Sequence, residues 1–288
     1  MRVALCLYGH SRTTDSRGLK IDWAEAVPYF KKNLIDLHDV DVFIHTWGDP
    51  LNEELRQDLV RDFAPAAIQI EKSIFPNYDV SSLNLNISFY SGIREGSKRV
   101  QAAMSRWDSQ KKSNDIKMHF EKQNDIKYDF VVSCRFDLLL YQPFPFGKMT
   151  PENYYVSNWH AFWKPEDRFY GYQDCWFVSG NKNTNIYCSM FDNLLDYWQD
   201  NSDLTDYCVN FLKKDNSTKF SSHVISRWHM INKGLISFER FYGVEYDTWS
   251  LLRKRGVKNN PHWDVPWGSS SIFNPAETIE KILKNVDK

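Results

Sequence analysis

The stretch Tyr128–Asp137, which reads YDFVVSCRFD, decides the expected fold. Its apolar run is typical of a strand buried on both faces of a parallel sheet, and the run delivers Asp137 to the strand's carboxyl end. Earlier apolar runs at residues 3–9 and 40–44 also end in polar residues, and segments with helical spacing at 23–37 and 52–63 follow them. This alternation predicts an α/β fold with a mixed, mostly parallel central sheet flanked by helices.

The pattern changes after residue 142. Short strands are expected at 154–157 and 175–179, and then apolar residues at helical spacing predict a helical second half with helices at 186–198, 204–212 and 220–233. We find no internal repeat and no clear linker, so the sequence predicts a single domain over residues 1–288, with halves at about 1–142 and 143–288.

Composition excludes several classes of protein. Lys and Arg number 36 against 37 for Asp and Glu, so no single-sign field exists to attract nucleic acid. The apolar run at the start of the sequence is too short for a signal peptide or a transmembrane segment. Five widely spaced cysteines, an odd number, suit buried thiols in a reducing, cytoplasmic compartment.

Arg135 and Asp137 form the most informative pair. Alternate residues of a strand share a face, so the two side chains are expected to point the same way, where the guanidinium can contact phosphate and the carboxylate a metal. The alternative for Asp137 is a turn or capping carboxylate without a functional role.

Four segments together resemble bacterial and viral glycosyltransferases of the GT-A class, including those that build polysaccharide or lipopolysaccharide. They are VALCLYGHSR (3–12), DVFIHTW (41–47), YDFVVSCRFD (128–137) and GYQDCWFVSG (171–180), and they span about two thirds of the chain. The resemblance implies a Rossmann-like GT-A domain, with the nucleotide-sugar half at 1–142 and the acceptor half at 143–288. It also implies that the protein is located in the cytoplasm of a bacterium or of a virus-infected host cell.

The same resemblance implies transfer of a sugar, as by a hexosyltransferase, from a nucleotide-diphosphate donor, first of all a UDP-sugar, to a glycan or other hydroxyl acceptor. In the class an Asp-x-Asp motif holds Mn²⁺ or Mg²⁺ on the diphosphate. Here Arg135 stands in the place of the first aspartate, so Asp137 is left as the metal carboxylate. A hard divalent cation would stabilise the charge that develops on the leaving diphosphate.

Further donor-binding residues are expected from their positions. Gly9 and Arg12 lie in the segment that resembles the first nucleotide-contacting loop of the class, where glycine permits close approach and arginine reaches phosphate. His45 can wall the base or ribose, and the polar helix face with Lys98 and Gln101 precedes the metal strand as donor-binding helices do. Without a ligand, Gly9 and Arg12 would belong to a plain loop, His45 would be a packing residue, and Lys98 and Gln101 would lie on a solvated helix face.

Asp174 is the expected catalytic residue. It lies where the class presents an acceptor-binding or catalytic carboxylate, and an aspartate can take the proton of an acceptor hydroxyl. In a retaining enzyme it would only orient the acceptor, and as an N-cap it would need no function. A histidine of the second half often completes the metal site, and His223, His229 and His262 qualify, with His223 taken as the metal ligand.

Two other classes remain as alternatives. The segment Gly92–Lys98 faintly resembles the phosphate-binding loop of kinases and sulfotransferases, but three residues separate its glycines where the motif needs four. A non-catalytic carbohydrate-binding protein would explain the 16% of aromatic residues but not the Arg135 and Asp137 pair.

Overall fold

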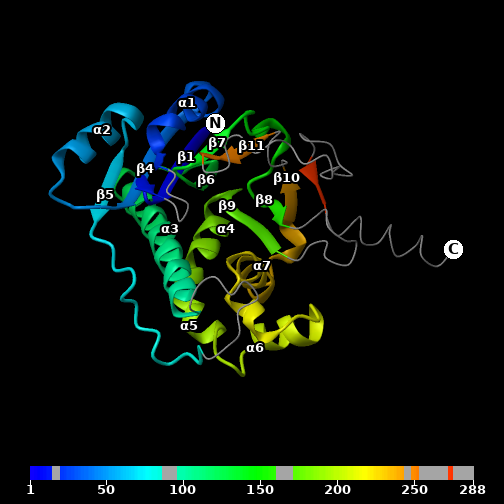
Figure 1. The fold of residues 1–288 in the computed structure, drawn as a ribbon. Coiled ribbons are helices and arrows are strands. Elements are labelled where there is room, and N and C mark those ends of the chain that lie inside the picture. The colour runs from blue at the N-terminus through cyan, green and yellow to red at the C-terminus, as the bar shows by residue number, and fades with distance from the viewer. Residues whose placement is uncertain (15–19, 86–95, 160–170, 243–247, 253–271, 275–288) are drawn as a thin grey trace.

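The computed structural model describes residues 1–14, 20–85, 96–159, 171–242, 248–252 and 272–274 (Figure 1). Within these residues an eight-stranded sheet has the strand order β12-β10-β8-β9-β6-β1-β4-β5. Its strands, in chain order, are β1 (Arg2–Gly9), β4 (Asp39–Trp47), β5 (Ala67–Glu71), β6 (Phe130–Arg135), β8 (Tyr154–Trp159), β9 (Gly171–Ser179), β10 (Glu239–Tyr242) and β12 (Ile272–Phe273).

The sheet is mixed and mostly parallel, as the sequence predicts. Strands β5, β4, β1 and β6 run parallel to one another, and β8 pairs in parallel with β10. Strand β9 is antiparallel to both of its neighbours, β6 and β8, and β12 is antiparallel to β10. Because β6 pairs with β9, the two halves of the sequence share one sheet.

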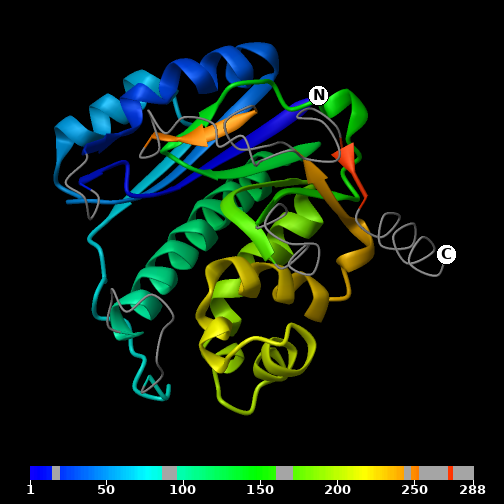
Figure 2. The ribbon, with the colours of Figure 1, turned by 45° about the vertical axis from the view of Figure 1, so that its right-hand side comes forward.

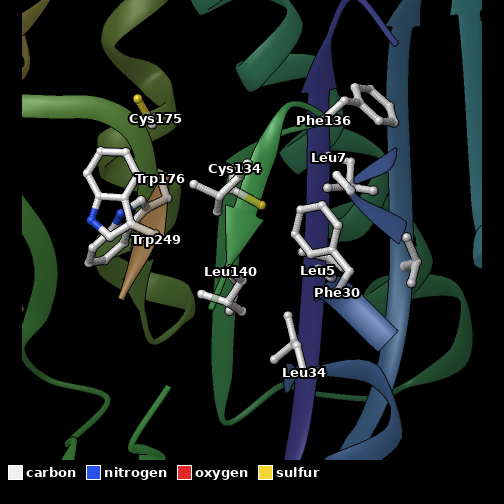
Figure 3. Packing of buried hydrophobic residues seen from close by; sticks show 14 of the residues in the cluster. Leu5, Leu7, Phe30, Leu34, Cys134, Phe136, Leu140, Cys175, Trp176 and Trp249 are labelled. Atoms are coloured by element: carbon white, nitrogen blue, oxygen red, sulfur yellow. The ribbon is translucent and has the colours of Figure 1, made fainter. Parts of the chain in front are cut away.

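Helices cover both faces of the sheet, which makes the fold compatible with a Rossmann-like architecture (Figure 2). The helices α1 (Val27–Asn33) and α2 (Glu53–Phe63) lie on one face, and α3 (Gly96–Asn124) lies on the other. Alternate residues of β1 divide between these layers: Leu5 and Leu7 pack toward α1, as Figure 3 shows, while Cys6 packs with residues of α3. This division follows from the two-residue period of a strand.

The second half is helical, as expected. It contains α4 (Asn181–Cys188), α5 (Leu194–Tyr197), α6 (Asp203–Asp206) and α7 (Ser222–Asn232). These helices, β8 to β10 and the first half of α3 enclose a second apolar cluster that includes Trp107 and Trp198. None of the described helices is long and apolar enough to cross a membrane.

Several elements differ from the sequence prediction. Helix α3 continues to Asn124, well beyond the apolar spacing that ends at Trp107, because its second half buries polar residues such as Ser113 and Lys117 against the protein. Strand β9 begins at Gly171, so Asp174 lies inside the strand and not ahead of it. Two small pairings were not expected: β2 (Arg12–Thr14) with β3 (Lys20–Asp22), and β7 (Leu138–Leu140) with β11 (Trp249–Leu251).

Candidate functional site at the carboxyl ends of β1 and β6

The order of the strands identifies where a ligand is expected. From β1 the chain moves outward to β4 and β5, and then returns to place β6 on the other side of β1. Ligands of open α/β sheets bind outside the carboxyl ends of the strands at such a reversal. Tyr8 of β1 and Arg135 of β6 are register partners there, so these two residues mark the candidate site.

A bulge in β9 brings Asp174 to the same place. Tyr155 pairs with Val178 and Ser157 pairs with Gln173, so residues 174–177 of β9 face the single residue Val156 of β8. Bulges re-aim side chains and are frequent beside active sites. The main-chain carbonyl of Asp174 accepts a hydrogen bond from the Tyr8 hydroxyl at 3.4 Å, which ties the bulge to the end of β1.

Arg106 of α3 completes this cluster, although no pattern in the sequence singles it out. Its Nη2 donates to the Tyr8 hydroxyl at 3.2 Å and to the carbonyl of Asp174. Its Nη1 lies 3.2 Å from Oδ2 of Asp174, in an ion pair whose side chains are 13% and 15% exposed. Burial raises the pKa of Tyr8 well above its usual range, so the phenol is neutral and donates.

His223 lies at the edge of the cluster, at the start of α7. Its Nδ1 is 2.7 Å from the carbonyl oxygen of Tyr172 and 3.9 Å from Oδ1 of Asp174. Burial lowers the pKa of His223, although Asp174 opposes that shift, so the ring is neutral at neutral pH. The carbonyl acceptor keeps the proton on Nδ1, and Nε2 then carries the lone pair that can accept a proton.

Gly171 permits this arrangement. A Cβ placed on Gly171 would lie 2.6 Å from the carbonyl carbon of His223 and 3.0 Å from the amide nitrogen of Val224. The start of β9 and the first turn of α7 therefore approach more closely than any other residue type allows. This close approach keeps His223 beside Asp174.

Asp137 is committed to Arg135 in the described structure. Nε and Nη2 of Arg135 donate to its two carboxylate oxygens at 2.8 and 2.7 Å, and Asp137 is only 3% exposed. The two side chains point toward each other, but β6 ends at Arg135 and Asp137 lies in the turn that follows, so this pairing comes from the turn and not from strand alternation. Its main-chain carbonyl accepts from the amide of Leu252, which fixes the turn between β6 and β7.

The residues at the end of β6 can be compared with the ligands that the expected Mn²⁺ or Mg²⁺ prefers. Divalent cations of this kind prefer oxygen ligands, usually including one or two carboxylates, but both oxygens of Asp137 are already bonded to a guanidinium. Across the described ranges no group of three or more His, Cys, Asp and Glu side chains is placed to hold an ion. The residues at the end of β6 do not fit a cation as they stand, so we derive no step through one.

The predicted donor residues on β1 and β4 are in contact with α3. Gly9 has a φ of +100°, a left-handed conformation that favours glycine, and its amide donates to Oγ of Ser109 at 2.7 Å. The same hydroxyl lies 2.7 Å from Nδ1 of His45, whose side chain is fully buried. Both residues therefore join the strand ends to Ser109 of α3, which lies about one helical turn from Arg106.

The other predicted residues lie elsewhere. Arg12 pairs with Asp22 at 3.0 Å and with Asp58 of α2 at 2.9 Å, so its guanidinium links the β2–β3 hairpin to α2. Gln101 is buried and exchanges hydrogen bonds of 2.7 and 2.6 Å with the main chain of Tyr78. Lys98, near the start of α3, is exposed.

Of the other candidates, His229 is a structural residue. Its Nδ1 lies 2.9 Å from the Tyr197 hydroxyl and its Nε2 lies 2.7 Å from the carbonyl of Ile186, so both ring nitrogens have partners inside the protein. His262 lies outside the described residues, as does most of the segment Gly92–Lys98 that resembles a phosphate-binding loop.

Comparison with known proteins adds no family. Neither a family model nor a curated protein matches the chain. Function must therefore be inferred from the residues that the fold brings together, which are Tyr8, Arg106, Arg135, Asp174 and His223.

Proposed function

We propose that the protein is a glycosyltransferase of the GT-A type, which moves a sugar from a nucleotide-diphosphate donor to a hydroxyl acceptor. The observation that carries this proposal is the ion pair of Arg106 and Asp174, at 3.2 Å, beside Tyr8 and Arg135 at the reversal of the strand order. It places guanidinium groups and a carboxylate side by side where an α/β sheet binds its ligands. Positive charge of this kind can stabilise the leaving diphosphate, and a carboxylate can take the proton of the acceptor hydroxyl.

The reaction can be written for these residues as a single displacement. The acceptor oxygen forms a bond to the anomeric carbon while its proton passes to the carboxylate of Asp174. The bond between the anomeric carbon and the diphosphate oxygen breaks, and its electron pair leaves with the diphosphate. Arg106 holds Asp174 in place through Nη1 and the Asp174 main chain through Nη2, and the neutral His223 ring borders the carboxylate.

The first experiment asks whether the protein consumes a nucleotide-sugar. Purified full-length protein would be incubated with UDP-, GDP- and CMP-sugars and a panel of glycan acceptors, and release of the nucleotide would be followed by chromatography. We expect one donor to be turned over. If the wild-type protein neither binds nor consumes any activated sugar across the panel, the proposal is wrong.

A matched pair of variants assigns the role of Asp174. Asp174→Asn keeps the size of the side chain and removes the proton acceptor, so turnover should fall by about 10²- to 10⁴-fold while donor binding persists. Asp41→Asn is the control, because Asp41 also pairs with an arginine, Arg2, at 2.8 Å, but at the opposite end of the sheet. Equal losses of turnover in the two variants would mean that Asp174 acts only through the fold.

The same assays separate transfer from simple carbohydrate binding. A non-catalytic carbohydrate-binding protein would bind a glycan without a nucleotide and would release no nucleotide from any donor. In such a protein Asp174→Asn would have no turnover to remove.

A further inference from the structure

Arg106 has hydrogen-bond donors with no acceptor among the described residues. Nη2 is bonded to the Tyr8 hydroxyl and to the Asp174 carbonyl, but Nε and Nη1 are buried and make no hydrogen bond. Nη1 is near Oδ2 of Asp174 as an ion pair only, without the geometry of a hydrogen bond. Buried donors without acceptors are costly, so this edge of the guanidinium is suited to an acceptor from outside the chain.

Arg135 lies beside Arg106 at the same sheet edge. Its register partner is Tyr8, whose hydroxyl Arg106 contacts. Burial lowers the pKa of Arg106 and the charge of Arg135 lowers it further, although Asp174 and nearby tyrosines more than offset both. Two like charges are therefore held close together in a largely buried place, where a ligand with two negative charges would relieve their repulsion.

The carboxylates in the cluster do not engage every nitrogen of the two guanidinium groups. Asp137 engages Arg135 through Nε and Nη2, so the third guanidinium nitrogen, Nη1, is outside that pair. Asp174 engages Arg106 through Nη1 and a main-chain carbonyl, so Nε is outside that pair. Guanidinium groups match the oxygens of phosphates in geometry and bind them with charge-assisted hydrogen bonds.

We propose that Arg106 and Arg135 together bind the diphosphate of the donor and supply the positive charge for its departure without a divalent cation. This inference rests on the proposed glycosyl transfer and names how that site holds its leaving group. The electron pair of the broken bond remains on the diphosphate oxygen, and the two guanidinium groups stabilise its charge. Arg106 would then contact both the leaving group and the carboxylate that takes the acceptor proton.

The test is calorimetric titration of inorganic pyrophosphate, UDP and GDP into the full-length protein, once with EDTA and once with excess Mn²⁺. We expect at least one of these ligands to bind in EDTA, with an affinity that Mn²⁺ changes little. Arg106→Gln should weaken that binding by about 10- to 100-fold, because charge-assisted hydrogen bonds are lost. Arg106→Lys, which keeps the charge but loses the planar fork, should fall between Arg106→Gln and the wild type.

Arg2→Lys is the matched control for Arg106→Lys. Arg2, like Arg106, forms an ion pair with an aspartate, Asp41 at 2.8 Å, but it lies at the amino end of β1, about 20 Å from Tyr8 along the strand. The Arg2→Lys variant should be less stable than the wild type but should bind the diphosphate with the same affinity. Melting temperatures of all variants show which of them are folded, and the comparison of EDTA with Mn²⁺ needs only the wild-type protein.

The outcomes separate this inference from the proposed function. If wild-type protein binds the diphosphates or a nucleotide-sugar only with Mn²⁺, the arginine inference is wrong and the glycosyltransferase proposal stands. The inference is equally wrong if folded Arg106→Gln binds in EDTA as tightly as the wild type. If no diphosphate and no nucleotide-sugar binds under either condition, both proposals fail.

Discussion

Replacing Gly171 with alanine tests whether the close approach of β9 to α7 builds the site. The new Cβ would lie 2.6 Å from the His223 carbonyl carbon and 3.0 Å from the Val224 nitrogen, and it would be closer still to the His223 carbonyl oxygen. All three atoms belong to the main chain, so no change of side-chain rotamer removes the overlap. Overpacking costs about 1 to 3 kcal/mol, and we expect the upper end, about 3 kcal/mol, because α7 itself must move.

The measurement is thermal unfolding followed by circular dichroism. At about 2 °C per kcal/mol for a protein of this size, Gly171→Ala should lower the melting temperature by about 6 °C. The control is Gly147→Ala, because a Cβ at Gly147 meets nothing within 4 Å. That change should stay within about 0.5 kcal/mol of the wild type.

The two alanine variants also predict different effects on the site. Movement of α7 displaces His223 from Asp174, so turnover of the donor should fall in Gly171→Ala and not in Gly147→Ala. If the two variants melt at the same temperature, the close approach at Gly171 is not a constraint, and the placement of His223 beside Asp174 loses its support.

Three more predictions concern the stability and reactivity of the fold. Arg227→Met removes the two guanidinium nitrogens that donate to the buried Glu239 carboxylate at 2.9 and 3.2 Å, so urea unfolding should show that the free energy of unfolding falls by about 3 to 5 kcal/mol. A decrease no larger than that of Arg61→Met, at an exposed arginine, would contradict this prediction. Burial lowers the pKa of His229 from 6.5 to about 4, so as the pH falls the unfolded chain takes up the proton before the folded protein does. The free energy of unfolding should therefore decrease as the pH falls from 6.5 toward 4, and an NMR titration of the His229 ring near 6.5 in the folded protein would refute this prediction. Burial raises the pKa of both Cys6 and Cys208 to about 12, and all five cysteines are buried. A thiol reagent at pH 8 should therefore react slowly with the folded protein, and it should modify five thiols once the protein is unfolded. A rapid reaction of the native protein would be inconsistent with the structure.

The architecture was predictable from the sequence because its buried parallel strands carry a strong signal. The apolar runs at 3–9, 40–44 and 128–135 became β1, β4 and β6, neighbours in the order β6-β1-β4. Such runs are legible because a strand covered on both faces admits few polar residues. The mixed, mostly parallel sheet and the helical second half followed from the same reasoning.

The composition of the site was only partly predictable. Asp174, His223 and Arg135 were expected to have functional roles, and the structure brings them to one sheet edge. Arg106 was missed because it stands between Ser105 and Trp107 in a helix whose apolar spacing gave no reason to single it out. Its position depends on the bulge in β9 and on the packing of α3 against β1, and neither has a signature in the sequence.

Local hydrogen bonding explains why other predicted residues lie apart from the cluster. Arg12 has two aspartates close by, Asp22 and Asp58, and the amide of Gln101 matches the free main-chain groups of Tyr78. Polar residues at strand ends and on helix faces serve such structural contacts as readily as they serve ligands. Residue type and position could not distinguish the two uses, since the partners are distant in the sequence.

Helix α3 unites the fold and the chemistry of the site. Ser109 bonds to the main chain of Gly9 and to the ring of His45, so it fixes the helix against the ends of β1 and β4. Arg106 lies three residues earlier, on the same side of the helix, and is thereby held against Tyr8 and Asp174. A guanidinium on a flexible loop would lose conformational entropy each time it bound a diphosphate, whereas Arg106 has already been ordered by folding. The buried polar contacts of α3 therefore do more than stabilise the sheet: they hold one edge of the Arg106 guanidinium in place for a ligand.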